Sequence, residues 1–238
     1  FVSRKTGVVA GMDMARTVLE EVGLTDIAVL VHDGTSLKAG DVLMTVRGDT
    51  RAILLAERTA LNFLGHLSGI ATLTRTWVDA VAGTKCEIRD TRKTTPGMRL
   101  LEKYAVRMGG GTNHRMSLSD AALIKDNHIA AAGGVAEAFS KVRAKFPTSE
   151  IEIEVDTLDQ LREVLPLKPD LVLLDNMSPA QCAEAVSIVA GATKLEASGG
   201  ISLENAKAYA ATGVNFLAIG ALTHSAPVFD IGLDLRAE

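Results

Sequence analysis

The sequence IEIEVDTLDQLREVLPLKPDLVLLD, residues 151–175, contains the pattern that decides the fold. Its first five residues are strand-like, Leu158–Val164 has apolar residues at helical spacing, and Leu171–Leu174 is a continuous apolar run. A helix between two short apolar strands is the pattern of a βαβ unit, in which the crossover is right-handed and the strands are parallel. This stretch therefore predicts an α/β protein with a parallel sheet.

The same alternation of strands and helices extends on both sides of this unit. The predicted strands are Cys86–Arg89, Ala122–Lys125, Ile151–Val155, Leu171–Leu174, Lys194–Ala197 and Asn215–Ile219. The predicted helices are Met98–Val106, Val135–Phe146, Leu158–Val164, Ala180–Val189 and Leu203–Ala211. Polar residues cluster at the C-terminal ends of the strands, which is where α/β barrels place their active sites. We therefore expect an incomplete α/β barrel of about six strands rather than an open doubly wound sheet.

The N-terminal region, residues 1–69, has a different pattern. Short strand-like runs at 27–31 and 41–48 are separated by turn residues. Before them, Asp13 is placed to cap a helix that continues to Val22, because its carboxylate can accept the amide hydrogens of the first turn. We expect these elements to form a separate domain.

A longer helical pattern begins at Thr50. Gly65 and Gly69 weaken it near its end, and a second helix is expected at 70–82. The sequence thus predicts two consecutive helices where the N-terminal domain meets the barrel.

Composition narrows the class of protein. Of the 238 residues, 47% are apolar but only 4% are aromatic, so aliphatic side chains fill the core. The net charge of −4 and the shortage of aromatic groups that stack on bases argue against a protein that binds nucleic acid. We expect no membrane span, because no run of about 18 apolar residues is present.

The two cysteines, Cys86 and Cys182, are too few and too isolated for a disulfide scaffold or a structural zinc site. No signal peptide is visible, so a reducing cytoplasm is the expected compartment. The chain begins at Phe1 rather than Met, in a strand-like run, and we expect that an N-terminal piece is absent.

The segment from Arg89 to Lys125 has a local excess of positive charge. Eight cationic side chains stand against Asp90, Glu102 and Asp120, so the segment has a net charge of +5 and the remainder of the chain −9. The cationic residues are Arg89, Arg92, Lys93, Arg99, Lys103, Arg107, Arg115 and Lys125. This excess, with the glycine triplet 109–111 inside it, predicts a binding site for a small polyanion.

Not every cation in this segment is expected to bind the ligand. The helical spacing of Arg99, Lys103 and Arg107 indicates a solvated helix face. The remaining cations flank two strands: Arg92 and Lys93 follow the first, His114 and Arg115 precede the second, and Lys125 ends it. Arginine pairs bidentately with carboxylate or phosphate, and an unpaired lysine on an apolar strand needs an anionic partner. A histidine such as His114 is more often a core residue than a ligand, but its neighbours favour a binding role.

Acidic side chains lie on or just after three other strands. Glu152, Glu154 and Asp156 alternate on one face of their strand, Asp175 ends the next strand, and Glu196 stands beside the end of the following one. Such carboxylates could hold Mg²⁺ or accept the hydroxyl groups of a ribose. Helix capping or loop solvation is an equally good explanation of Asp175 alone. Glu154 and Asp175 together, at neighbouring strand ends, favour function.

Glycines follow the last two strands. Ser198, Gly199 and Gly200 precede a helix, and Gly220 and Ala221 follow the final strand. Backbone amides in such loops bind phosphate, and α/β barrels often use their last two loops in this way. A glycine needed only for turn geometry is the alternative.

These segments together resemble the quinolinate phosphoribosyltransferase family, the nicotinate-nucleotide pyrophosphorylases. The resemblance is carried by AERTALNFLGHLSGIAT at 56–72, RDTRKTTPGMR at 89–99, EKYAVRMGGGTNHR at 102–115, LIKDNH at 123–128, EIEVD at 152–156, LLDN at 173–176, EASGGI at 196–201 and IGALTHS at 219–225. They span nearly the whole chain. Ser117 departs from the family, which usually has glycine there, and we expect little effect.

The resemblance implies an N-terminal α/β sandwich domain at 1–69, an incomplete α/β barrel at 70–226, and a tail at 227–238 that returns to the first domain. It also implies a homodimer in which Arg58 enters the partner's active site. Nucleic-acid and membrane partners are not expected.

The resemblance also implies roles for individual residues. Those implied to bind the pyridine dicarboxylate are Arg58, Arg92, Lys93, His114, Arg115 and Lys125. Those implied to bind the 5′-phosphate are Ser198, Gly199, Gly200, Gly220 and Ala221. Thr91 and Ile219 are implied to bind substrate as well. Glu154 and Asp175 would hold the phosphoribosyl group and Mg²⁺, and with Lys125 they are the implied catalytic residues.

The implied reaction joins quinolinate and phosphoribosyl pyrophosphate to give nicotinate mononucleotide, pyrophosphate and CO₂. Three alternatives remain open at this point. Two are enzymes: a nicotinate phosphoribosyltransferase and a paralogue that acts on another anionic heterocycle. The third is a non-catalytic protein that binds a phosphate ligand, which would not need both Glu154 and Asp175.

Overall fold

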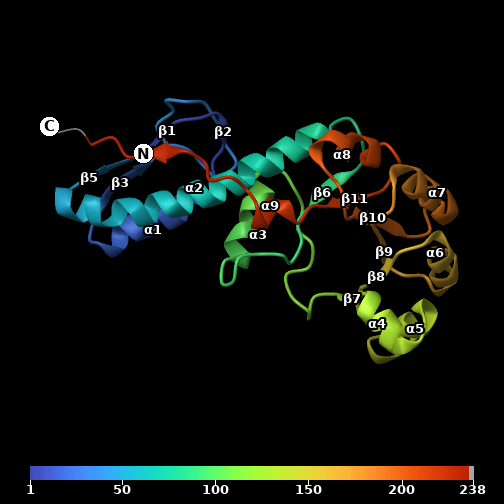
Figure 1. The fold of residues 1–238 in the computed structure, drawn as a ribbon. Helices are drawn as coiled ribbons and strands as arrows, with labels where there is room; N and C mark the ends of the chain where they lie inside the picture. The colour runs from blue at the N-terminus through green and yellow to red at the C-terminus, as the bar shows by residue number, and fades with distance from the viewer. Residues whose placement is uncertain (236–238) are drawn as a thin grey trace. The chain divides into compact units, whose positions relative to one another are not determined.

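The computed structural model describes residues 1–235, which form two compact units (Figure 1). The first unit comprises Phe1–Val78, Lys93–Thr112 and the chain from Ala221 onward, and the second comprises Asp79–Arg92 and Asn113–Gly220. Each unit is thus assembled from separate stretches of chain. No helix within residues 1–235 is long and apolar enough to cross a membrane.

The first unit is the sandwich-like part of the protein. Its elements are β1 (Val2–Ser3), β2 (Gly7–Val8), α1 (Met12–Glu21), β3 (Asp26–Val29), β4 (Ser36–Leu37), β5 (Met44–Arg47), α2 (Thr50–Ala80, which ends in the second unit), α3 (Arg99–Met108), α9 (Ala221–His224) and β12 (Ile231–Gly232). Antiparallel pairs form between β1 and β12, β2 and β4, and β3 and β5. Side chains of α1 and α2 such as Leu19, Ile53 and Leu64 close the core against Leu37 and Leu43.

The helix α1 is capped differently from the sequence prediction. Asp13 lies inside its first turn, and the N-cap is Gly11, in a left-handed conformation that suits glycine. The free amide hydrogens of Gly11 and Met12 are accepted by the Asp33 carboxylate at 3.0 and 3.1 Å. The prediction of an Asp13 cap is therefore wrong, because a carboxylate distant in sequence satisfies those donors.

Helix α2 is continuous, so the predicted break near Gly65 and Gly69 is also wrong. Both glycines are buried where another segment crosses the helix. A Cβ at Gly65 would lie 2.9 Å from Val228 Cγ1, and one at Gly69 would overlap the carbonyl oxygen of Pro227. These glycines permit close approach of the backbone, and the packing offsets their low helix propensity.

Helix α3 is less solvated than its charge pattern indicates. Arg107 is exposed as predicted and Arg99 is half-buried, but Lys103 is fully buried, as is Glu102 beside it. The interpretation of Lys103 as part of a solvated face is wrong. Glu102 accepts hydrogen bonds from the Thr95 amide at 3.0 Å and pairs with His66 Nε2 at 2.9 Å, so its charge has partners inside the unit.

The second unit is an incomplete α/β barrel, as predicted. Its elements are β6 (Glu87–Arg89), β7 (Ala122–Ile124), α4 (Asp126–Ala132), α5 (Val135–Lys145), β8 (Ile151–Val155), α6 (Leu158–Val164), the 3₁₀ turn Leu165–Leu167, β9 (Leu171–Asp175), α7 (Pro179–Val189), β10 (Lys194–Ser198), α8 (Leu203–Ala210) and β11 (Phe216–Ala218). The six strands are parallel in the order β6-β11-β10-β9-β8-β7, and within the described residues β6 and β7 do not pair to close a ring. In this unit, α4 and the 3₁₀ turn were not predicted from the sequence, because both are short. In the first unit, the short elements β2, β4, β12 and α9 were not predicted either.

The register of these strands places the charged residues on one face of the sheet. Residues Glu154, Leu173, Glu196 and Phe216 form one lateral row, and Asp175, Ser198, Ala218 and Arg89 form the next. Paired residues of a parallel sheet share a face, so both rows lie on the same side. The opposite face carries fully buried aliphatic residues such as Ile153, Val172 and Leu217, and helices α5 to α8 lie outside the strands (Figure 1).

We expect substitution of Gly69 by alanine to destabilise the first unit by about 1–3 kcal/mol, because the added methyl group overpacks against backbone that cannot move aside easily. G65A should cost less, because its nearest neighbour is a side-chain methyl group of Val228. Free energies of unfolding from urea titrations measure both. The exposed Asn62 on the same helix supplies the control N62A. A G69A protein as stable as wild type would contradict the close approach.

Candidate active site

Two arginines of the second unit stand close together. Arg92 follows β6, and Arg115 lies in the loop before β7; both are half-buried. Burial lowers the pKa of Arg115, and the positive charge of Arg92 lowers it further. The Arg115 guanidinium donates from Nη1 to the carbonyl oxygen of Ala121 at 2.8 Å, and its Nε is buried without a hydrogen-bond partner. Two neighbouring cations of this kind favour an anionic ligand.

A buried aspartate holds the two arginine segments together. Asp90, immediately after β6, is fully buried and accepts hydrogen bonds from the His114 amide at 2.8 Å and from Asn113 Nδ2 at 2.5 Å. It therefore ties the loop that carries Arg115 to the strand end that carries Arg92. Sequence reasoning counted Asp90 only as a charge opposing the basic residues. Asp90 stands directly after a strand, inside the basic stretch, and this position is the signal of a structural role that sequence reasoning missed.

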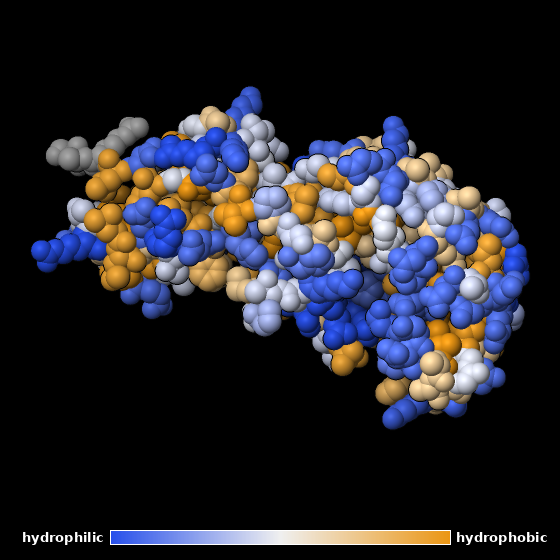
Figure 2. Space-filling model, in the orientation of Figure 1, coloured by the Kyte–Doolittle hydropathy of each residue, from blue (hydrophilic) through white to orange (hydrophobic). Residues whose placement is uncertain are grey.

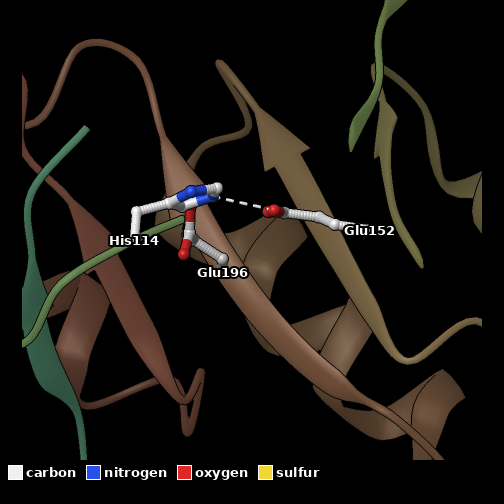
Figure 3. A group of neighbouring side chains, drawn as sticks. All are labelled: His114, Glu152 and Glu196. Atoms are coloured by element: carbon white, nitrogen blue, oxygen red, sulfur yellow. Dashed lines mark ion pairs between the residues drawn. The ribbon is translucent and has the colours of Figure 1, made fainter. Parts of the chain in front are cut away.

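His114 is buried among charged side chains from three strands (Figure 3). Its Nε2 lies 2.8 Å from Glu152 Oε2 and 3.6 Å from Glu196 Oε1. Glu196 is fully buried in the middle of β10, rather than beside its end, and accepts a hydrogen bond from Arg89 Nη1 at 2.8 Å. Arg89 in turn stacks on the Phe216 ring, with Cζ 3.8 Å from the ring centroid.

Among the described residues, these are also the three side chains of metal-binding type that lie close together. The ligand atoms of His114, Glu152 and Glu196 lie within 4.8 Å of one another. However, the 2.8 Å separation of His114 Nε2 and Glu152 fits an N–H···O hydrogen bond, and Glu196 already accepts a hydrogen bond from Arg89. We therefore describe this group as a hydrogen-bonded cluster.

Lys125, Glu154 and Asp175 form a second charged group. Lys125 Nζ donates to Glu154 Oε2 at 2.9 Å. Half of the Lys125 side chain is exposed, whereas Glu154 is buried. Burial and the nearby charge of Glu154 raise the pKa of Asp175. The two carboxylates lie on the same face of neighbouring strands, because Glu154 pairs with Leu173, two residues before Asp175. Asp156, expected on the same face of the strand as Glu154, instead follows the end of β8 and is exposed.

The glycines of the loop after β10 allow neighbouring groups to approach its backbone closely. Gly199 and Gly200 both have positive φ angles, and a Cβ at Gly199 would overlap Asn176 Oδ1. Asn176 also donates its amide N–H to the carbonyl oxygen of Ser198 at 2.9 Å and its side-chain Nδ2 to Asp175 at 2.6 Å. Asn176, which sequence reasoning did not single out, therefore connects the predicted phosphate loop to the predicted catalytic aspartate.

The remaining predicted residues are distributed over both units. Thr91 and Gly220 are half-buried in the second unit, where Ile219 is buried and donates its amide hydrogen to the Arg89 carbonyl oxygen at 2.9 Å. Arg58, Lys93 and Ala221 belong to the first unit, in which Arg58 on α2 and Lys93 are exposed. The roles of these residues stay predictions.

A hollow of about 610 Å³ lies elsewhere on the second unit, at the N-terminal ends of β9, β10 and β11. Lys168, Asp170, Lys194 and Asn215 are among the residues that line it. None of the predicted site residues does, and α/β barrels place their active sites at the other end of the strands. The candidate site is therefore the charged face and its C-terminal strand ends.

The comparisons with known proteins agree on one family. The protein-family model of the quinolinate phosphoribosyl transferase N-terminal domain matches residues 1–68. The family model of the C-terminal domain matches residues 70–234. The chain is 56% identical to a nicotinate-nucleotide pyrophosphorylase [carboxylating] of Mycobacterium leprae, over 99% of this chain and 85% of that protein. It is 39% identical to quinolinate phosphoribosyltransferase [decarboxylating] 2, mitochondrial, of Nicotiana glauca, over 100% and 73%. The crystal structure of the nicotinate-nucleotide pyrophosphorylase of Ehrlichia chaffeensis superposes with a TM-score of 0.95 at 40% identity, over 99% of this chain and 86% of that one.

The buried carboxyl of Glu196 makes stability depend on pH. Burial, and then the charge of Glu152, raise its pKa from 4.5 to about 7. The folded protein thus keeps this proton where the unfolded chain has lost it, so stability falls as the pH rises from about 4.5 to about 7. The loss from this residue is about 3 kcal/mol. We expect E196Q to lose correspondingly less stability over this range in urea unfolding followed by circular dichroism.

The control for that experiment is E163Q, which replaces an exposed glutamate on α6. It should follow wild type at every pH. If E196Q follows wild type as well, Glu196 is ionised in the folded protein and the account of the cluster is wrong.

Proposed function

Because the chain belongs to the quinolinate phosphoribosyltransferase family, we propose that the charged face of its second unit carries out that family's reaction. The protein transfers the phosphoribosyl group of phosphoribosyl pyrophosphate to quinolinate, with loss of CO₂, and produces nicotinate mononucleotide and pyrophosphate. It is a pentosyltransferase of de novo NAD biosynthesis. The relatives named above cover nearly the whole chain, so both domains take part in the comparison.

The pair of arginines is the observation that carries the assignment of the acceptor. Quinolinate has two carboxylates, and Arg92 and Arg115 are close enough that one lowers the pKa of the other. A dicarboxylate would offset this repulsion with two charge-assisted hydrogen-bonded pairs. Nicotinate has one carboxylate and would form only one of these two pairs. The arginine pair therefore favours quinolinate over nicotinate, in agreement with the names of the relatives.

The carboxylates of Glu154 and Asp175 suit the phosphoribosyl side of the reaction. Their mutual repulsion contributes to the raised pKa of Asp175, which a bound cation would relieve. Mg²⁺ takes one or two protein carboxylates together with substrate phosphates, so these two residues fit it. When bound there, Mg²⁺ supplies positive charge for the departing pyrophosphate. The loop Ser198–Gly200, with its two positive φ angles, would hold the 5′-phosphate.

The residues of this face work mainly by position and charge. Arg92 and Arg115 orient the acceptor so that its ring nitrogen reaches the anomeric carbon. Glu154 and Asp175 place negative charge beside the positive charge that develops at that carbon. Lys125 is kept in place by Glu154 and provides a further cation for the acceptor. After the carbon–nitrogen bond has formed, the 2-carboxylate leaves as CO₂, and no covalent enzyme intermediate is required.

A second copy of the chain is the partner that the first unit suits. Arg58 is exposed on α2, and beside it Leu54 and Leu55 are 53% and 74% exposed. Figure 2 shows apolar surface on this unit. Exposed leucines next to an arginine are suited to a homodimer in which Arg58 enters the partner's acceptor site. Such an enzyme would work in the cytoplasm, where the buried cysteines Cys86 and Cys182 stay reduced.

The direct test is a reaction mixture of the protein with quinolinate, phosphoribosyl pyrophosphate and Mg²⁺, assayed for CO₂ and pyrophosphate. Both products should appear in equal amounts, and nicotinate should not replace quinolinate. In K125A, we expect kcat/KM to fall, with a loss of about 2–4 kcal/mol of transition-state stabilisation. This is the scale for one preorganised charged contact. K145A, which removes an exposed lysine at the end of α5, is the control and should match wild type. A K125A enzyme with unchanged kcat/KM would remove Lys125 from the site.

Mixing two inactive variants tests the contribution of Arg58. R58A and K125A should each be nearly inactive, because each lacks one cation of the acceptor site. If Arg58 acts in the partner's site, a mixed dimer has one intact site, and an equal mixture should recover about a quarter of wild-type activity after subunit exchange. An exchanged mixture that stays inactive would show that Arg58 acts within its own chain.

A further inference from the structure

A buried cluster lies beneath the proposed acceptor site. Glu152 on β8 and Glu196 on β10 flank the His114 ring, and Arg89 on β6 pairs with Glu196 (Figure 3). Glu152 is 3% exposed and Glu196 fully buried. Two carboxylates in such a position cost desolvation energy, so the contacts they make require an explanation. The mechanism above uses neither of them.

The hydrogen bonds of the His114 ring fix its protonation state. Nδ1 accepts the amide hydrogen of Arg115 at 2.8 Å, so this nitrogen carries no proton. The ring proton is therefore on Nε2, which donates it to Glu152 at 2.8 Å. Both ring nitrogens are thus committed to the protein. In this arrangement neither is left to bind a carboxylate of the substrate, which is the role that resemblance assigns to His114.

The same hydrogen bonds connect Glu152 to Arg115. Strand β8 is buried at all five positions and paired on both sides, so it holds Glu152 firmly. Glu152 fixes the ring, and the ring receives the amide hydrogen of the next residue, Arg115. The backbone conformation at Arg115 determines the point from which its side chain extends. Glu152 is thus linked to the backbone of Arg115 through the ring, and its charge also acts on the Arg115 guanidinium, where it partly offsets the lowering of the pKa.

We propose that Glu152 is a positioning residue of the acceptor site, which acts through the His114 ring to hold Arg115 in place for one carboxylate of quinolinate. This inference rests on the proposed function, because it takes Arg115 to be the group that binds the acceptor. It assigns Glu152 a role in acceptor affinity and none in binding phosphoribosyl pyrophosphate. It also makes His114 a connecting group rather than a direct ligand.

Steady-state kinetics of Glu152 variants test this role. In E152A the His114 ring loses the acceptor of its Nε2–H, and Arg115 loses its fixed position. We expect the KM for quinolinate to rise roughly tenfold to a hundredfold, the range for a small misplacement of a binding group, while the KM for phosphoribosyl pyrophosphate stays within about twofold. E152Q keeps an oxygen that accepts the Nε2 proton. It should fold like wild type and stay within about threefold of its quinolinate KM.

A double-mutant cycle tests whether Glu152 acts through His114. If it does, E152A combined with H114A should be no worse than H114A alone. H66A is the matched control, because His66 forms a similar pair with the buried Glu102 within the first unit. It should lower stability and leave both KM values unchanged.

Nitrogen NMR of the His114 ring provides a measurement that does not depend on activity. At about pH 7.5 the chemical shifts should show the Nε2–H tautomer in wild type. An Nδ1–H tautomer, an equal rise of both KM values in E152A, additive losses in the double mutant, or a large loss in E152Q would each overturn the proposal. A wild-type protein that produces no CO₂ from quinolinate would instead overturn the proposed function, and the tautomer would still be measurable.

Discussion

Charge on one face of a parallel sheet is the constraint on which the rest of this structure depends. The strand register puts Glu154 and Glu196 in one lateral row and Asp175 and Arg89 in the next, all on the same side. Carboxylates buried in this way must find partners or change their protonation. Glu196 does both: it pairs with Arg89, and its pKa rises to about 7. The aliphatic residues of the opposite face form the apolar core together with the helices.

The charges on this face separate into two groups that suit the two substrates. At one place the neighbouring cations Arg92 and Arg115 favour a dicarboxylate. At the other, Glu154 and Asp175 suit a sugar that develops positive charge and a cation that accompanies its pyrophosphate. Beneath them, Glu152 and His114 are engaged with each other and with the backbone. In the proposed function, the residues below the site hold its shape, and the residues at the strand ends bind the ligands.

Much of the architecture could be predicted from the sequence, because it depends on local patterns. Apolar runs and helical spacing identified all six strands of the sheet and placed Glu154 and Asp175 at neighbouring strand ends. Contacts between residues far apart in sequence could not be predicted in this way. Asp33 caps α1 in place of Asp13, and the packing of Pro227 and Val228 keeps α2 continuous across two glycines. The pairing of Glu152 with His114 could not be predicted for the same reason, because a count of charges does not show which acidic side chains are buried.

The central claim is that the acceptor site is built for two carboxylates. Calorimetric titration of the wild-type protein with quinolinate and, separately, with nicotinate tests it most directly. If Arg92 and Arg115 each take one carboxylate, quinolinate should bind at least about tenfold more tightly, because loss of one charge-assisted contact costs more than about 1.4 kcal/mol. Equal affinities for the two acids would contradict the account.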